Sequence, residues 1–253
     1  MERVGELLSL HRTQNPYLYI DTKTFGFGSD NIDTWVIEQG GDTVGVIYRY
    51  YNSLQLCVFD ADMDVSEIAE FMRSGEYSMA SGTADVVRKV ASILDNYSAH
   101  TGVIMEAELE DTSLSGATEL ASVSDCHKIA ELICSDDDIG GHYSVPLLEK
   151  QLAERMTDWN CINVILKSDG KIVCHMATYA DCDELCVLGG LITESEHRGH
   201  GYGRIVLTDL AKHVAADGKI PLLYCYDENT IAWYKRLGWK LVTECGKLER
   251  KKS

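Results

Sequence analysis

The sequence predicts a mixed α/β protein made of two similar halves, and three observations support this. Strand-like runs separated by tight turns occur in both halves, as TWVIEQGGDTVGVIYRYYNSLQLCVF (34–59) and INVILKSDGKIVCHMATYADCDELCVLGGLI (162–192). A shift of 129 residues places Gly41 on Gly170 and Leu56-Cys57-Val58 on Leu185-Cys186-Val187. Each half then continues as helix, strand and helix, and such short connections imply parallel neighbouring strands. The expected fold is a mixed β-sheet flanked by helices, present twice in tandem.

The first half reads in order as three strands, a helix, a strand and a helix. Gly40-Gly41 and Asn52-Ser53 mark the two turns between the three strands. The later elements are DVSEIAEFMRS (64–74) as helix, YSMASG (77–82) as a short strand and TADVVRKVASILDNY (83–97) as helix.

A polar stretch over 109–122, LEDTSLSGATELAS, is the natural join between the halves, so we expect one domain over 1–120 and another over 121–253. The second half begins with the helix-prone VPLLEKQLAERM (145–156). Its later elements are a helix GRIVLTDLAKHVAAD (203–217), a strand IPLLYCYD (220–227) and the run TIAWYKRLG (230–238).

Composition limits the classes of partner. The formal net charge of −17 repels nucleic acid and anionic membranes, so neither is expected as a partner. No apolar run reaches the roughly 20 residues needed to span a bilayer, and MERVGELLSLHRTQ does not resemble a secretory signal. The expected location is therefore the cytoplasm. The nine cysteines include no C-x-x-C and the histidines are dispersed, so no metal site is expected.

The repeat fails at one place, which is the run Arg198-Gly199-His200-Gly201-Tyr202-Gly203 before the helix of the second half. The first half has no glycines at the matching positions. Glycine permits a positive φ and keeps side chains away from the backbone, so successive N–H groups can point into one concavity. A helix start already offers about four unpaired N–H groups and a partial positive charge. The run is therefore predicted to hold a phosphate or pyrophosphate, and a tight strand-to-helix turn is the alternative.

The same residues resemble the Q/R-x-x-G-x-G/A signature of the GNAT superfamily of acyl-CoA-dependent N-acyltransferases. The run NTIAWYKRLGW also resembles the closing motif of this family, in which a tyrosine, here Tyr234, precedes Gly-aromatic, here Gly238-Trp239. The resemblance covers about residues 125–253. The first half resembles a degenerate copy without the phosphate loop, as in a subgroup of predicted acetyltransferases.

The resemblance implies acetyl-CoA as co-substrate, no metal, and a set of binding residues. The backbone of Leu191, Ile192 and Thr193 would pair with the pantetheine arm, as a peptide adds to a strand edge. The pyrophosphate would be held by the loop, namely Arg198, Gly199, His200, Gly201, Tyr202, Gly203 and Arg204. His197 also flanks the glycines, either as a phosphate contact or as a solvated loop residue.

The resemblance also implies roles in proton transfer. Tyr234 is the candidate acid for the departing thiolate, with a half-buried core tyrosine as the alternative. Glu184 is the candidate base, although it appears one residue from the usual place, which would turn it to the other face of the strand unless a bulge intervenes. The family often has an asparagine seven residues before the tyrosine. Asp227 holds that position here, and Asn229, two residues later, is the candidate contact to coenzyme A.

Three functions fit these features. The first is transfer of an acetyl group from acetyl-CoA to a primary amine of a small molecule or peptide, and the acidic first half could face a cationic acceptor. The second is a non-catalytic acyl-CoA sensor, which the position of Glu184 keeps open. The third is an aminoacyl transferase that uses tRNA, against which the net charge and the intact loop argue. A homodimer is compatible with the sequence, which leaves the oligomeric state open.

Overall fold

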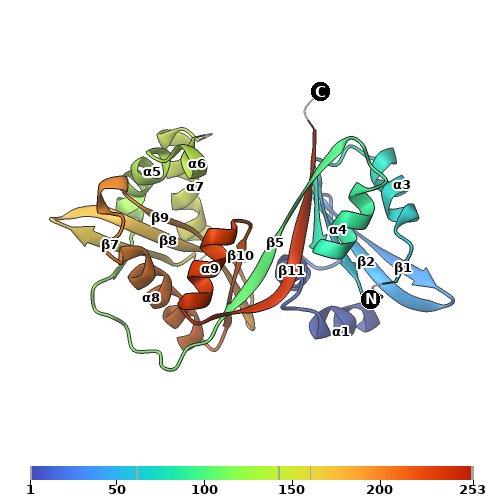
Figure 1. Ribbon diagram of the computed structural model, residues 1–253, viewed down its shortest axis with the longest axis horizontal. Helices are drawn as coiled ribbons and strands as arrows, with labels where there is room; N and C mark the ends of the chain where they lie inside the picture. Colours follow the sequence, from blue (N-terminus) through green and yellow to red (C-terminus); the bar gives the residue numbers. More distant parts are fainter. Residues whose placement is uncertain (1, 61, 142, 160, 252–253) are drawn as a thin grey trace. The chain divides into compact units, whose positions relative to one another are not determined.

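The computed structural model describes residues 2–60, 62–141, 143–159 and 161–251. The chain forms two compact units: unit 1 is Met1–Glu106 with Tyr224–Ser253, and unit 2 is Ala107–Leu223. Each unit contains β-strands flanked by helices, as the sequence predicts (Figure 1). The expected division between residues 120 and 121 does not coincide with these units, because the C-terminal segment lies with the first half of the chain.

Unit 1 contains the elements expected for the first half, three further elements of that half (α1, α2 and β5), and two elements from the end of the chain. These are α1 (Glu2–Leu10), α2 (Pro16–Phe25), β1 (Ile32–Gln39), β2 (Asp42–Tyr50), β3 (Ser53–Val58), α3 (Ser66–Ser74), β4 (Met79–Thr83), α4 (Ala84–Ala91), β5 (Tyr97–Ala107), α9 (Glu228–Arg236) and β11 (Trp239–Arg250).

The strand order in unit 1 is β1-β2-β3-β4-β11-β5. The first three strands are antiparallel neighbours, and β3 runs parallel to β4 after the α3 crossover, as predicted. The sequence did not indicate β5 or β11 as strands. β11 pairs antiparallel with β4, from Cys245↔Thr83 to Glu249↔Met79, and Figure 1 shows it in red beside the green β5. The last strand of the chain therefore completes the sheet of the first half.

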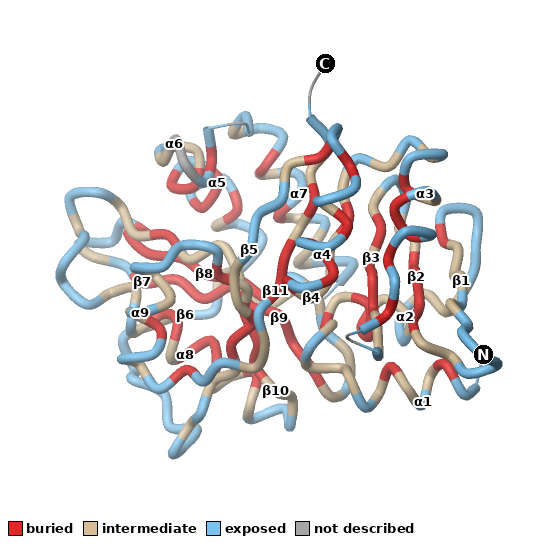
Figure 2. Tube along the Cα trace, turned by 45° about the vertical axis from the view of Figure 1, so that its right-hand side comes forward, coloured by how far each residue is buried: buried red, intermediate tan, exposed pale blue. Residues whose placement is uncertain are grey.

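The core of unit 1 lies between this sheet and the helices α3 and α4. Leu54, Leu56 and Met72 are almost fully buried in it, and Leu248 of β11 belongs to the same cluster. Figure 2 shows the buried parts of β2 and β3 in red. α3 ends at Ser74, where the sequence predicts its end. α4 ends at Ala91, so the helix expected over 83–97 is shorter than predicted.

Unit 2 contains the elements around the predicted phosphate loop. These are β6 (Glu119–Leu120), the 3-10 turn η1 (Val123–Asp125), α5 (Cys126–Cys134), α6 (Asp137–Gly140), α7 (Val145–Asp158), β7 (Asn163–Ser168), β8 (Lys171–Asp181), β9 (Leu185–Thr193), the 3-10 turn η2 (Ser195–His197), α8 (Tyr202–Ala216) and β10 (Ile220–Cys225).

The strand order in unit 2 is β10-β9-β8-β7-β6, and β10 runs parallel to β9 as predicted. The Asp169-Gly170 turn joins β7 and β8, with both residues at positive φ. α5 and α7 pack on one face of the strands against Ile165, Ile172 and Ile192, and α8 lies on the other face (Figure 1). Among the helices of the described residues, none is long and apolar enough to cross a bilayer.

His175 of β8 is buried on the α5/α7 face, opposite Ile165 and Ile192 in register. Asn163 donates from Nδ2 to the Cys161 carbonyl (3.2 Å), so its Oδ1 accepts from the His175 Nε2–H at 2.9 Å. The other ring nitrogen, Nδ1, has no hydrogen-bond partner in the described part of the chain. Burial lowers the pKa of His175 to about 3, with a further contribution from the charge of Arg155. The ring is therefore neutral at physiological pH.

This burial predicts that acid destabilises the protein through His175. Between the unfolded pKa of 6.5 and the folded pKa of about 3, only the unfolded state takes up the proton, so the unfolding free energy falls as the pH decreases through this range. Wild type should lose about 2 kcal/mol more than His175→Leu between pH 7 and pH 5. Urea unfolding at the two pH values measures this difference, and equal losses in both proteins would contradict it.

Candidate functional site

The glycine run forms the turn between β9 and α8 in unit 2. Gly199 and Gly201 both have φ of +81°, and Gly201 is the left-handed residue directly before α8. A Cβ atom at either position would meet nothing within 4 Å, so the backbone conformation and not space requires glycine there. Gly203 differs, because it lies in the first turn of α8 without a positive φ. Its Cβ would lie 3.4 Å from the Thr193 Oγ1, an ordinary contact.

The start of α8 leaves backbone N–H groups open. The first helical bond is from the Ile205 amide to the Gly201 carbonyl, at 3.2 Å. No side chain caps the helix, and among the described residues no carbonyl outside the helix accepts from the amides of Tyr202, Gly203 or Arg204. These three groups carry the positive end of the dipole of a 15-residue helix. The turn therefore has the geometry of an anion site.

Two charged side chains at the loop, Arg198 and Glu194, are paired within the protein. Arg198 donates from Nε to the Thr193 carbonyl at 3.0 Å and pairs through Nη2 with Asp136 Oδ2 at 2.6 Å. Arg198, which was expected to hold the pyrophosphate, thus fastens the loop to the end of β9 and to Asp136, the residue before α6. Glu194 pairs with Lys171, and this hydrogen bond holds the Glu194 pKa below its usual value.

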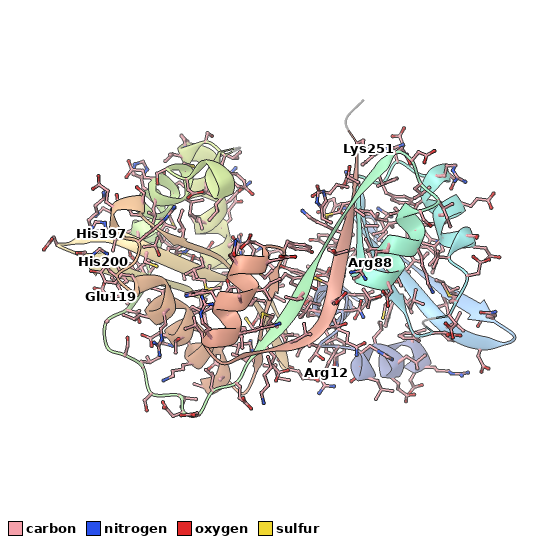
Figure 3. The ribbon with its side chains drawn as sticks, in the orientation of Figure 1. Arg12, Arg88, Glu119, His197, His200 and Lys251 are labelled. Carbon is pink, nitrogen blue, oxygen red and sulfur yellow. The ribbon has the colours of Figure 1, made fainter. Side chains whose placement is uncertain are left out.

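Two histidines flank the loop and stack on one tyrosine. The ring centroids of His197 and His200 lie 6.3 and 5.8 Å from that of Tyr202. The Nδ1 of His200 lies 3.1 Å from the Arg198 carbonyl, to which it donates. Figure 3 shows both histidines together at the end of the strands. This stacking and the bond to the Arg198 carbonyl connect the residues of the loop that precede the open amides.

One edge of β9 is open next to this loop. Among the described residues, β9 pairs with β10 from Leu185↔Ile220 to Leu188↔Leu223, although β9 continues to Thr193. The predicted pantetheine-binding residues Leu191, Ile192 and Thr193 follow on this edge, and the open edge ends at the loop. This is the edge to which an amide-bearing chain can add like a strand.

The register of β9 on its other side contains a bulge. Ala177 pairs with Gly189 and His175 with Ile192, so Gly190 and Leu191 both oppose the single residue Met176. Gly190 has φ of +66°, which favours glycine. The bulge turns the Gly190 and Leu191 backbone away from the regular ladder in the middle of the proposed ligand edge.

The proposed catalytic residues lie in different surroundings. Tyr234 is on α9 in unit 1, 7% exposed, with its ring 5.1 Å from Trp233 and 5.9 Å from Trp239. Burial raises its pKa, so the hydroxyl keeps its proton at physiological pH. Glu184 comes just before β9, which begins at Leu185, and is roughly 20 Å along the strand from Gly190. That position does not support a base role at the bulge.

Asp227 and Asn229 lie at the start of α9. The Asp227 carboxylate accepts from the Thr230 amide at 2.7 Å and so caps the helix, which explains an acid where the family often has asparagine. Asn229 is exposed in the first turn. Its predicted contact with coenzyme A stays a prediction.

The structure adds a buried acid that the sequence analysis did not single out. Asp209, in the middle of α8, is 1% exposed and accepts hydrogen bonds from Ser115 N (3.0 Å), Ser115 Oγ (2.6 Å) and Thr118 Oγ1 (2.7 Å). It ties the helix of the phosphate loop to the segment before β6. An acid between the buried Leu207 and Leu210 is the signal that could have indicated it.

Comparison with known proteins shows which fold this chain resembles. Residues 173–247 match the family model described as FR47-like protein. The fold resembles an acetyltransferase of the GNAT family from Colwellia psychrerythraea, with 18% identity, a TM-score of 0.57 and coverage of 96% of this chain and 97% of that one. This chain has a GNAT fold.

Two further solved structures resemble this chain over most of its length. A Drosophila protein has a TM-score of 0.65 at 14% identity, covering 99% of this chain and 96% of its own. A tandem GNAT protein from the clavulanic acid biosynthesis pathway has a TM-score of 0.54 at 13% identity, covering 93% of this chain and 88% of its own. None of the curated proteins compared with the chain matches it. The expected resemblance and fold, including the tandem arrangement, are confirmed.

Proposed function

We propose that the protein is an N-acetyltransferase that moves the acetyl group of acetyl-CoA to a primary amine. The observation that carries the proposal is the continuity of the β9 edge with the open amides of α8. Beyond Leu188, the side of β9 that faces β10 has no strand partner in the described part of the chain. This edge leads directly to a turn with two left-handed glycines and three N–H groups that find no acceptor among the same residues. An extended amide-bearing arm that ends in a pyrophosphate matches these two features in order.

In this reaction the neutral amine attacks the thioester carbon, a C–N bond forms and the C–S bond breaks. The amine loses one proton, and the departing thiolate takes up one. We assign the second proton to Tyr234, since its raised pKa keeps the hydroxyl protonated at the pH where the amine reacts. Proton removal from the amine is assigned to water, because Glu184 lies at the far end of β9 from the bulge.

Tyr234→Phe tests the assigned acid. With an accepted amine, the variant should release coenzyme A about 100-fold more slowly than wild type, while its Kd for acetyl-CoA changes little. Thiol release under saturating acetyl-CoA measures the rate, and titration calorimetry measures the Kd. An unchanged rate would remove Tyr234 from the mechanism. Acetyl-CoA binding without turnover of any amine would instead favour the non-catalytic sensor.

A further inference from the structure

Tyr179 of β8 occupies a second bulge, next to the one in β9. Thr178 pairs with Leu188 and Ala180 with Val187, so Tyr179 is the additional residue on β8. Its ring lies over Gly189 and Gly190: a Cβ at Gly189 would be 2.9 Å from Tyr179 Cδ2, and one at Gly190 would be 2.6 Å from the Tyr179 hydroxyl. Both glycines are therefore needed to make room for this ring. The tyrosine is nevertheless 44% exposed.

Arg155 of α7 lies on the same ring. Its guanidinium carbon is 4.2 Å from the Tyr179 ring centroid, and Nη2 donates to the Thr178 carbonyl at 2.8 Å. Nη2 also contacts Cys161 Sγ at 3.9 Å. The guanidinium is thus held in one orientation by stacking and by a backbone bond. Arg155 would therefore lose little further side-chain entropy when it binds a ligand.

The charge of Arg155 has no partner among the described residues. It forms no ion pair, and its Nε and Nη1 donate to none of these residues, although other lysines and arginines of unit 2 pair with carboxylates. The acid before it in α7, Glu154, pairs with Lys150 at 3.6 Å. The nearby His175 is buried and neutral, so it does not compensate the charge of Arg155. An oriented guanidinium, with two nitrogens that donate to none of the described residues, thus lies over the ring of an exposed tyrosine whose hydroxyl is next to the Gly190 bulge.

We propose that Arg155 and Tyr179 bind a carboxylate of the acceptor, so that the substrate is an amine that also carries a carboxylate, such as an amino acid. The inference rests on the proposed function, because it assumes that the acyl group lies at the β9 bulge. A carboxylate accepts a charge-assisted N–H bond from the guanidinium nitrogen Nε or Nη1, and the phenol can donate a second bond. The hydroxyl lies next to Gly190, so the carboxylate and the attacking amine are separated by only a few bonds. The cationic acceptor suggested by the overall charge does not fit this pair.

The test compares amines that differ only in the carboxylate. The pairs are glycine and methylamine, phenylalanine and phenethylamine, and lysine and cadaverine, each assayed by coenzyme A release at equal concentrations of the neutral amine. In wild type, kcat/KM for the carboxylate-bearing member of at least one pair should be about 30-fold higher or more. Arg155→Met should bring that ratio close to one, and Tyr179→Phe should lower it about fivefold. The Kd for acetyl-CoA should stay unchanged in both variants.

Lys150→Met is the matched control, since it removes one cation from the same helix α7 and should leave the ratio unchanged. Equal or better turnover of the decarboxylated members by wild type would overturn the proposal, and this result does not depend on any variant being folded. Failure to acetylate any member while acetyl-CoA still binds would overturn it as well and leave the binding site standing. Absence of acetyl-CoA binding would overturn the proposed function, and the acceptor proposal with it.

Discussion

Asp209→Ala is expected to lower the unfolding free energy by about 3 kcal/mol. The carboxylate is 1% exposed and accepts three hydrogen bonds from Ser115 and Thr118. Alanine removes all three bonds, two of them to hydroxyls, and releases the segment from the middle of α8. Urea unfolding followed by far-UV circular dichroism measures the loss.

Two further variants calibrate this expectation. Thr118→Ala removes one of the three bonds and should cost about 1 kcal/mol. Lys212→Ala, on the same helix as Asp209, removes the ion pair with the exposed Asp111 and the bond to the Ser113 carbonyl, and should cost about 1 kcal/mol. An Asp209→Ala protein as stable as Lys212→Ala would show that the bonds to Asp209 do not hold the segment.

The parts of the fold that follow from local sequence were predictable. The Gly40-Gly41 and Asp169-Gly170 turns have the positive φ values that their residues suggest, and strands lie on both sides of each turn. The glycine run before α8 could also be recognised, because two of its three glycines are required by backbone conformation at a helix start. These features depend on neighbouring residues only.

The features that the sequence did not reveal depend on contacts between distant residues. β11 pairs with β4, about 160 residues earlier in the chain, so no local pattern could place it in unit 1. Asp209 accepts hydrogen bonds from Ser115 and Thr118, which lie more than 90 residues earlier in the chain. Tyr179 gains its position from two bulges whose register shifts become visible only when β8 and β9 are paired. Glu184 was placed by counting along one strand, and the observed start of β9 leaves it at the far end from the loop.

Gly201→Val is expected to abolish acetyl-CoA binding. Gly201 has φ of +81°, which a β-branched residue adopts only with strain of roughly 1–3 kcal/mol, and a side chain would stand at the open amides of α8. Gly218, just past the other end of α8, has φ of +77° and likewise nothing within 4 Å of a Cβ. Gly218→Val therefore introduces the same strain away from the loop, and it should bind acetyl-CoA as wild type does.

The most direct test of the central claim, that β9 and the glycine loop hold acyl-CoA, is the unfolding midpoint of these three proteins with and without acetyl-CoA. Ligand at about 100 times its Kd should add roughly 2.7 kcal/mol, a rise of several degrees. We expect this rise in wild type and Gly218→Val and none in Gly201→Val. No rise in wild type, or an equal rise in Gly201→Val, would contradict it.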